Sequence, residues 1–262
     1  MIQQNNAAPI ALLDSGAGGI GVLREVQQLL PSEQLLYFGD TANAPYGEKP
    51  PNVVRSLALQ AAERLIGQRI KALVLACNTA TAIAAAELRN RHPHLPIIGM
   101  EPALCPAVAA CVGKAHPRVL VLATAATLRG EKFDLLRKKY EKTATVVALP
   151  APGIVRLVEA GLEDSPEMDA YLHELFAPLT TPPDAVVLGC THFPFAKKAL
   201  QRALGKSVPF FDGAKGTAVQ LRRRLSQQGL LSPPHAKGGV LLSAGKPDAL
   251  PLLIRLYRSC SF

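Results

Sequence analysis

Two short stretches, VLACNT at residues 74–79 and VLGCTH at residues 187–192, decide the fold of this chain. Each is a run of apolar, mostly strand-forming residues that stops abruptly at a cysteine followed by hydrogen-bonding residues. A helical pattern follows each stretch, with Thr81 and Pro194 as the expected first helical residues. Buried parallel strands that lead through a polar loop into a helix have this pattern. The two stretches therefore predict parallel strands with polar loops at their carboxyl ends.

The same pattern recurs along the 262 residues of the chain. Short runs of Val, Ile, Leu and Ala alternate with helix-like segments, and such alternation is typical of βα units. Hydrophobic residues make up 48% of the chain, which is enough for one or two sizeable cores. The fold class expected is therefore α/β. The predicted strands are residues 10–13, 35–38, 72–76, 97–98, 118–122 and 185–188, and the clearest predicted helices are residues 20–30, 52–67 and 81–90.

The order of these features suggests an internal repeat. Asp14-Ser15 precedes Cys77, and Thr124 precedes Cys190 at a similar separation along the chain. We therefore expect two pseudo-symmetric domains, each with a central, mainly parallel sheet flanked by helices. Residues 1–101 plus 213–262 are assigned to the first domain, and residues 102–212 to the second. Open α/β sheets bind ligands at the carboxyl ends of their strands, so we expect the active site in a cleft between the domains.

The charge of the chain raises a second functional class. A formal net charge of +9 at pH 7 can indicate a polyanionic partner. The densest basic cluster, Arg222 to Arg224, is flanked by Leu221 and Leu225, as on the solvent-facing side of a helix. No aromatic residues are interleaved with these charges to stack on bases. We expect no nucleic-acid partner, and a basic nucleic-acid-binding or inhibitory interaction protein stays the alternative.

The cysteines and the amino terminus indicate the cellular compartment. The five cysteines form no C-x-x-C pair and no paired metal-ligand spacing, which favours free thiols in a reducing compartment and no metal site. The first residues lack the basic region of a signal peptide, and no apolar stretch is long enough to span a bilayer. We expect a cytoplasmic protein with no membrane partner. The cysteines are Cys77, Cys105, Cys111, Cys190 and Cys260.

Cys77 and Cys190 are candidate catalytic residues because their contexts match. A helix amino terminus offers free N–H groups and a positive dipole end, which stabilise a thiolate. A single cysteine in an apolar run is often an inert core residue, but two in matching contexts favour a shared role. Inverting a stereocentre by proton transfer needs a base on one face of the carbon and an acid on the other. Two like thiols meet this requirement.

Polar residues near the two thiols can support such chemistry. Asp14 can hold a substrate ammonium or assist Cys77, or it can serve only as an Asx-type turn residue. His192 can assist Cys190 or have a structural role. Donors are also needed to bind the substrate carboxylate and stabilise charge. The available donors are Ser15, Asn78, Thr79, Thr124, Thr127 and Thr191.

The glycine-rich stretch DSGAGG at residues 14–19 invites a nucleotide-binding interpretation. No Gly-Lys-Ser/Thr follows it, and Glu33 and Asp40 match a ribose-binding acid only loosely. Glycines here more readily allow the backbone to approach a small ligand. No nucleotide cofactor is therefore expected.

Five motifs in this order resemble the bacterial glutamate racemases, from about Ile10 to Asp212. The resemblance implies a two-domain α/β fold with pseudo-twofold symmetry. It also implies that L- and D-glutamate are interconverted without pyridoxal phosphate, metal or nucleotide, to supply D-glutamate for peptidoglycan. The two-thiol argument leads to the same chemistry but does not name glutamate. The motifs are DSGAGGIGVLREV (14–26), GDTANAPYGEKP (39–50), ACNTATA (76–82), GMEPALCPA (99–107) and GCTHFPF (189–195).

The resemblance assigns roles to residues of this chain. It makes Cys77 and Cys190 the two catalytic thiols, with Asp14 expected to assist the first and His192 the second. Glu159 is matched to a family glutamate near the second thiol, although LPAPG at residues 149–153 replaces a segment that usually begins Ala-Cys-Pro. The substrate-binding positions implied are Asp14, Ser15, Tyr46, Gly47, Asn78, Thr79, Thr124, Thr191 and His192.

The resemblance also leaves alternatives. Asn43 stands where the family often has an arginine, while the Pro45-Tyr46-Gly47 turn is intact. A racemase for aspartate or hydantoin from the same superfamily is the nearest rival, and a related one-thiol decarboxylase is more distant. The expected partner is a small molecule, glutamate, and a homodimer is the assembly considered.

Overall fold

Two all-parallel sheets organise the chain in the computed structural model, which describes residues 6–205 and 207–259. Contacts divide the chain into two compact units. The first unit runs to Met100 and resumes at Ala214, and the second is Glu101–Gly213. The predicted α/β class is confirmed. Cys77, Cys105, Cys111 and Cys190 are free thiols, and Cys260 lies outside the described residues.

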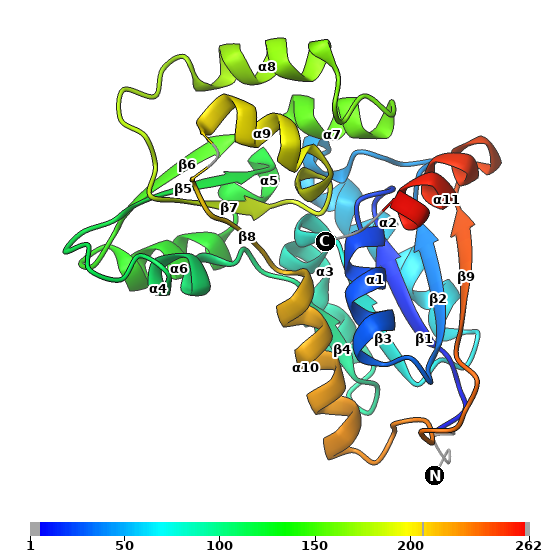
Figure 1. Ribbon diagram of the computed structural model, residues 1–262. Coiled ribbons are helices and arrows are strands. Elements are labelled where there is room, and N and C mark those ends of the chain that lie inside the picture. The colour runs from blue at the N-terminus through cyan, green and yellow to red at the C-terminus, as the bar shows by residue number, and fades with distance from the viewer. Residues whose placement is uncertain (1–5, 206, 260–262) are drawn as a thin grey trace. The chain divides into compact units, whose positions relative to one another are not determined.

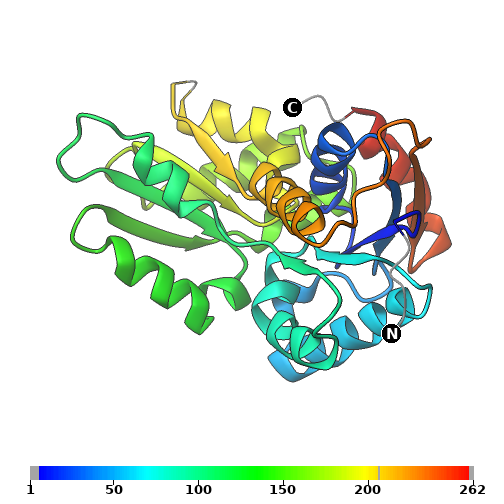
Figure 2. The same cartoon turned by 90° about the horizontal axis from the view of Figure 1, so that it is seen from below.

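The first unit holds a five-stranded sheet with the order β4-β3-β1-β2-β9. Helices α1 and α10 pack together on one side of it, and α2 and α3 pack together on the other (Figures 1 and 2). The strands are β1 (Ile10–Asp14), β2 (Gln34–Gly39), β3 (Ala72–Leu75), β4 (Ile97–Gly99) and β9 (Gly239–Ala244). The helices are α1 (Ile20–Leu29), α2 (Pro51–Ile66), α3 (Asn78–Arg91), α10 (Ala214–Gln227) and α11 (Leu250–Ser259), with short 3-10 turns η1 (Tyr46–Glu48) and η3 (Pro247–Ala249).

The second unit holds a four-stranded sheet with the order β6-β5-β7-β8. Helices α7, α8 and α9 cover one face of this sheet, and α4 and α6 cover the other (Figure 1). The strands are β5 (Arg118–Ala123), β6 (Thr145–Pro150), β7 (Ala185–Gly189) and β8 (Phe210–Asp212). The helices are α4 (Leu104–Ala109), α5 (Ala125–Leu128), α6 (Glu131–Tyr140), α7 (Pro152–Glu159), α8 (Pro166–Phe176) and α9 (Lys197–Leu204), with the 3-10 turn η2 (Phe193–Ala196).

The central strands are buried on both faces, which explains their unbroken apolar sequences. In β5, Leu120 and Leu122 pack in the core with α7, α8 and α9. Val119 and Val121, which alternate with them, pack in the core with α4 and α6. Successive side chains of a strand point to opposite faces, so a strand covered on both sides needs apolar residues at every position.

The two sheets share one topology. In each, the first strand of the unit lies between the second and the third, and the fourth lies beyond the third. The chain therefore turns to one side after the first strand and to the other side after the third. Such a topological switch point is where open α/β sheets bind ligands, beyond the carboxyl ends of the two central strands. The first unit differs by its additional edge strand β9, which pairs with β2.

All six predicted strands are present, but two predicted helix starts are wrong. After Cys77 the helix begins at Asn78, three residues before Thr81, because Cys77 itself is the N-cap residue. After Cys190 the chain first forms η2, and α9 begins only at Lys197. Strands β6, β8 and β9 were not predicted. They are edge strands, and their side chains are exposed or only partly buried.

Helix α10 carries the basic cluster that the sequence analysis singled out. Arg222, Arg223 and Arg224 are exposed, while Leu221 and Leu225 are fully buried. The cluster thus forms the solvated side of an amphipathic helix, as predicted. Within the described residues, no helix combines the length and apolar character needed to cross a bilayer.

Candidate active site

The switch point of each sheet brings together residues that are distant in sequence. In the first unit Leu13 pairs with Leu75, and in the second Leu122 pairs with Leu188. Two residues beyond each pair, one strand is followed by a hydroxyl residue and the other by a cysteine. These are Ser15 with Cys77, and Thr124 with Cys190.

Cys77 lies at the amino terminus of α3, where its thiol is hydrogen-bonded to Ser15 and Ala80. The Sγ atom donates to Ser15 Oγ at 3.6 Å and accepts from the Ala80 N–H at 3.5 Å. Only 6% of the residue is exposed. A sulfur that accepts an N–H bond at a helix amino terminus is in a setting that favours the thiolate.

Asp14 ends β1 and is fully buried. Its Oδ1 atom accepts from the Gly16 N–H at 2.9 Å, which is the Asx-type turn bond considered for this residue. Gly19 allows this packing, because a Cβ atom there would lie 2.7 Å from the Asp14 Cβ and 3.0 Å from the Ala76 Cβ. Asp14 thus shapes the loop next to Cys77 and also places a carboxyl group there.

Asn78 is the first residue of α3 and carries a buried amide. Neither its Oδ1 nor its Nδ2 atom has a hydrogen-bond partner in the described part of the chain. Leaving such groups unsatisfied costs about 1–3 kcal/mol each. A ligand that offers both donors and acceptors would remove this cost. Thr79, the next residue, is also buried.

Tyr46 begins η1 and is held by Asp40. The phenol donates to Asp40 Oδ2 at 2.6 Å, and the Asn43 amide donates to both oxygens of Asp40 at 3.0 and 3.1 Å. Burial raises the pKa of Tyr46 above its ordinary value. The hydrogen bond to Asp40 and the negative charges of Asp40, Cys77 and Asp14 raise it further. Tyr46 is therefore a neutral donor, and Gly47 beside it is buried.

In the second unit, Cys190 is the first of three side chains that contact one another in a row. Its Sγ atom is 3.7 Å from His192 Nδ1, and His192 Nε2 is 2.6 Å from Glu159 Oε1. Burial by itself lowers the pKa of His192, but the hydrogen bonds to Cys190 and Glu159 and their charges raise it well above its usual value. The imidazole is therefore poised to carry a proton beside the thiol, which is 7% exposed.

Threonine hydroxyl groups lie in the loops that follow β5 and β7 of the second unit. Thr124 is the N-cap residue of α5, where its Oγ1 accepts from the Thr127 N–H at 3.2 Å and donates to Thr127 Oγ1 at 3.0 Å. Thr191 follows Cys190 and is buried. Both units thus place a thiol and hydroxyl groups at their switch points.

Comparison with known proteins assigns the family. The family model described as Asp/Glu/Hydantoin racemase matches residues 21–221. The chain belongs to the Asp/Glu/Hydantoin racemase family. It is 42% identical over 252 residues to a glutamate racemase of Clostridium acetobutylicum, covering 95% of this chain and 96% of that relative. The predicted resemblance is confirmed, and so is the prediction that the chain is an isomerase.

Solved structures of glutamate racemases have the same fold. One from Francisella tularensis, in complex with D-glutamate, has a TM-score of 0.83 at 26% identity and covers 98% of this chain and 96% of its own. Another from Escherichia coli, in complex with L-glutamate and the activator UDP-MurNAc-ala, has a TM-score of 0.81 at 29% identity and covers 96% and 95%. The two-unit α/β architecture is therefore that of this racemase family.

The two halves of this racemase differ in what supports each thiol. The strand register places Ala123 of the second unit at the position of Asp14 in the first, so the second unit lacks this carboxylate. His192 and Glu159 stand beside Cys190 instead. The contact of Asp40 with Tyr46 was not predicted from the sequence, where Asp40 was only a loose match to a ribose-binding acid. Its position in the motif that contains the Pro-Tyr-Gly turn was the available signal.

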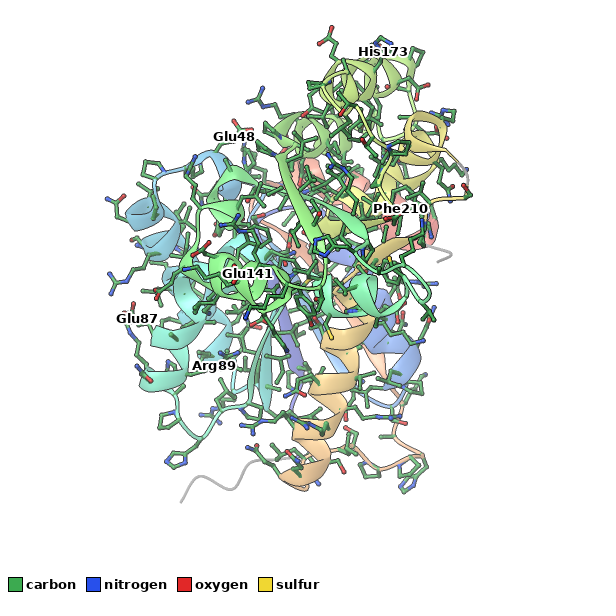
Figure 3. All side chains as sticks on the ribbon, turned by 90° about the vertical axis from the view of Figure 1, so that its left-hand side faces the viewer. Glu48, Glu87, Arg89, Glu141, His173 and Phe210 are labelled. Atoms are coloured by element: carbon green, nitrogen blue, oxygen red, sulfur yellow. The ribbon has the colours of Figure 1, made fainter. Side chains whose placement is uncertain are left out.

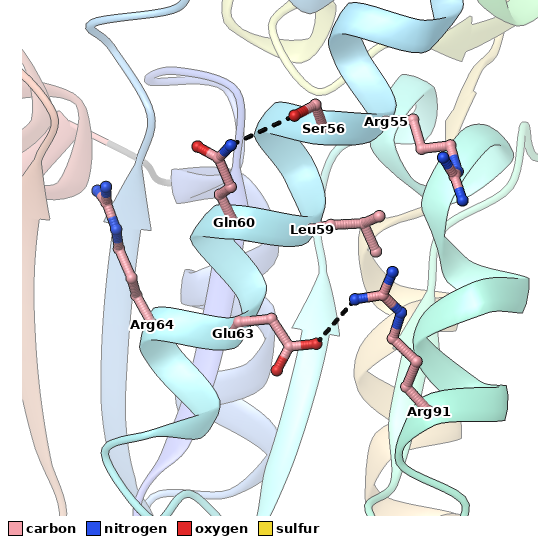
Figure 4. Close-up of a pocket in the computed structure, with 7 residues that line it drawn as sticks. All are labelled: Arg55, Ser56, Leu59, Gln60, Glu63, Arg64 and Arg91. Atoms are coloured by element: carbon pink, nitrogen blue, oxygen red, sulfur yellow. Dashed lines mark hydrogen bonds and ion pairs between the residues drawn. The ribbon is translucent and has the colours of Figure 1, made fainter.

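A surface pocket of the first unit is separate from these residues. It has a volume of about 450 Å³ and lies along α2, with Arg91 of α3 at its edge (Figure 4). Arg91 pairs with Glu63 and with Glu87, which lies at the outer surface of α3 (Figure 3). None of the predicted site residues lines this pocket.

Proposed function

We propose that this chain interconverts L- and D-glutamate by proton transfer to and from the thiols of Cys77 and Cys190, without a bound cofactor. The observation that carries the proposal is the equivalent placement of the two buried thiols at matching switch points, each next to a strand that is followed by a hydroxyl residue. The substrate is inferred from the relatives, which are glutamate racemases matched over almost their whole length.

The proposed reaction uses one thiolate and one thiol in each turnover. The thiolate on one side removes the proton from the α-carbon, and the electron pair of the broken C–H bond stays on that carbon, next to the carboxylate. The thiol on the other side then gives its proton to the opposite face of the carbon. Base and acid have exchanged protonation states, and the opposite enantiomer is used in the reverse direction. The proposal thus requires both switch points to serve one substrate.

The unsatisfied amide of Asn78 supports an amino-acid substrate. A zwitterion offers ammonium donors and carboxylate acceptors, which match the free Oδ1 and Nδ2 atoms of Asn78. We propose that Ser15, Thr79, Tyr46 and Gly47 bind the same substrate from the first unit. From the second unit, Thr124 and Thr191 are proposed to contribute hydroxyl groups.

The helpers proposed for the two thiols differ in kind. Asp14 is proposed to assist Cys77 and to hold the substrate ammonium, in addition to its turn bond. His192 is proposed to assist Cys190, because a protonated imidazole 3.7 Å from the sulfur stabilises the thiolate. Glu159 then balances the charge of His192.

The cellular role follows from the substrate. We propose that the two compact units are the two catalytic domains and that the enzyme works in the cytoplasm, where it supplies D-glutamate for peptidoglycan. A homodimer is the assembly proposed, and sedimentation equilibrium of the pure protein tests it.

Substrate and reaction are tested together with the purified protein and no added cofactor. Separate samples of L- and D-glutamate in D2O should lose optical rotation and gain deuterium at the α-carbon, while L- and D-aspartate under the same conditions should react far more slowly. Equal rates with aspartate would assign the rival substrate, and no exchange with any of the four would contradict racemisation.

The two-thiol mechanism is tested with Cys77→Ala and Cys190→Ala. Each variant should lose racemisation of both enantiomers, since every turnover needs both an acid and a base. Cys111→Ala is the matched control, because Cys111 is a free thiol of the second unit whose Sγ bonds to the Ala107 carbonyl. Parental rates in either active-site variant would rule the mechanism out.

A further inference from the structure

Glu159 depends on a short helix for its position. It is the last residue of α7, which has eight residues. Isolated helices of this length are marginal in water, so packing must determine where α7 lies. Ile154, Val155 and Val158 bury one side of the helix in the core. Apolar contacts of this kind allow small shifts along the helix axis, so a more specific contact is needed to hold the carboxylate against His192.

Such a contact exists at the amino terminus of α7. The N-cap residue, Ala151, has no side chain that can accept a hydrogen bond, and Pro152 follows it. The Gly153 N–H lies in the first turn, where an N–H group has no partner within its own helix. It donates instead to the hydroxyl of Tyr171 at 3.1 Å. Tyr171 belongs to α8, so one helix supplies the cap of the other.

The ring of Tyr171 also occupies the space above Gly153. A Cβ atom on residue 153 would lie 2.4 Å from Tyr171 Cε2 and 2.5 Å from Cζ. Only glycine therefore allows the ring to approach the backbone of α7 this closely. Gly153 lies in the LPAPG segment, which leads from β6 into α7. The ring of Tyr171 thus occupies the space that a side chain on residue 153 would need.

We propose that Tyr171 is a positioning residue that fixes the first turn of α7 and thereby holds Glu159 against His192. The proposal rests on the function proposed for Cys190 and deepens it. Gly153 and Glu159 are six residues apart, so about 9 Å of helix axis joins them. A helix transmits a displacement of its first turn along this distance. A shift of about 1 Å would stretch the 2.6 Å bond between His192 Nε2 and Glu159 Oε1 beyond hydrogen-bond range.

Two substitutions separate the two parts of the contact. Tyr171→Phe keeps the ring and removes only the acceptor of the Gly153 N–H. Gly153→Ala keeps the hydroxyl and adds a Cβ, so that the ring or the helix must move by about 1 Å to regain normal contact. Tyr140→Phe of α6 and Gly216→Ala of α10 are the matched controls, and a Cβ on residue 216 would meet nothing within 4 Å.

The direct measurement is the pKa of His192 by NMR of its imidazole, assigned by comparison with His192→Gln. Glu159 raises this pKa, so both variants should lower it in the direction of Glu159→Gln, while the two controls leave it unchanged. When Glu159→Gln is already present, adding Tyr171→Phe should not change the pKa of His192. A parental pKa in Tyr171→Phe, or an equal shift in the presence and absence of Glu159, would overturn the proposal.

Kinetics give a second measurement. Tyr171→Phe should lower kcat/KM for glutamate about 10-fold, the scale expected for misplacing a supporting group, and should have no effect in the Glu159→Gln background. Equal losses in both backgrounds would show that Tyr171 does not act through Glu159. Because the NMR titration needs no turnover, it decides this inference even if the parent protein does not racemise glutamate.

Discussion

His192 combines burial with two hydrogen-bonding neighbours that raise its pKa. Its ring lies between the Cys190 sulfur and the Glu159 carboxylate, and both of them favour the protonated imidazole. A charge buried in this way is stabilising only while its partners remain. The stability of the second unit should therefore depend on pH through this residue.

The sign of this pH dependence follows from the raised pKa of His192. Its contribution to folding is fully present below the unfolded value of about 6.5 and is lost as the pH rises through the higher folded value. Urea unfolding at a series of pH values should show this loss in the parent protein and a smaller one in Glu159→Gln. Glu174→Gln, an exposed residue of α8, is the control and should follow the parent. An unchanged pH dependence in Glu159→Gln would contradict the assignment.

Asn78 allows stability and function to be separated. Its buried amide has no partner among the residues that the structure describes, so Asn78→Ala removes an unsatisfied group and places a better helix former at the start of α3. We expect an unchanged or higher Tm together with a fall in kcat/KM of about 100-fold, because substrate loses its partner. Asn90→Ala, at an exposed position of the same helix, should keep full activity. A clear loss of stability in Asn78→Ala would show that the amide has a structural partner.

At the scale of elements, the loop between β1 and α1 depends on close backbone packing. Asp14, Gly19 and Ala76 meet where β1 and β3 end, and the space between them admits no additional methyl group. This packing brings Ser15 to the Cys77 thiol. The glycine-rich stretch thus allows the loop after β1 to pack closely against the end of β3.

Gly19→Ala tests that packing. The added Cβ would lie 2.7 Å from the Asp14 Cβ, and overpacking of this kind costs about 1–3 kcal/mol. Both the free energy of unfolding and the activity should fall, since Asp14 and Ala76 adjoin the site. Gly67→Ala is the matched control: its Cβ would have ordinary contacts at 3.5 Å, and it should be neutral or slightly stabilising. If Gly19→Ala unfolds at the same urea concentration as the parent, the space between Gly19, Asp14 and Ala76 does admit a methyl group.

At the scale of the whole molecule, the first unit is assembled from two separate parts of the chain. Lys71 and Glu33 form a buried ion pair, with side chains 0% and 2% exposed. Ser232, from the segment after α10, accepts from Lys71 Nζ at 3.0 Å and donates through its hydroxyl to Glu33 Oε2 at 2.8 Å. This network joins residues before Met100 to residues after Ala214.

Lys71→Met should therefore destabilise the first unit strongly. It leaves the Glu33 carboxylate buried without its cation, which costs about 3–5 kcal/mol in comparable cases. Lys138→Met removes only an exposed pair with Asp134, which solvent screens, and should cost far less. Urea unfolding monitored by circular dichroism compares the two variants. Equal, small losses would mean that the buried pair does not join the two parts of the unit.

Much of the fold could be predicted from local patterns in the sequence. Strands buried on both faces, such as β1, β3, β5 and β7, have continuous apolar sequences. The edge strand β9 was missed because its side chains alternate between partial burial and exposure and its place is decided by pairing with β2. Helix starts were displaced because Cys77 acts as a cap, a role rarely expected of cysteine.

The sequence by itself determined the α/β class, the repeated strand-cysteine pattern and the family, because all three depend on residues that are close together in the sequence. Only the tertiary structure placed Ser15 against Cys77, Tyr46 against Asp40 and Tyr171 against Gly153. These contacts join residues from different loops or helices, and the order of the strands and the packing of the helices decide which of them meet. The resemblance had already matched Glu159 to the second thiol, but its contact with His192 depends on tertiary structure, since α7 brings Glu159 back to the end of β7.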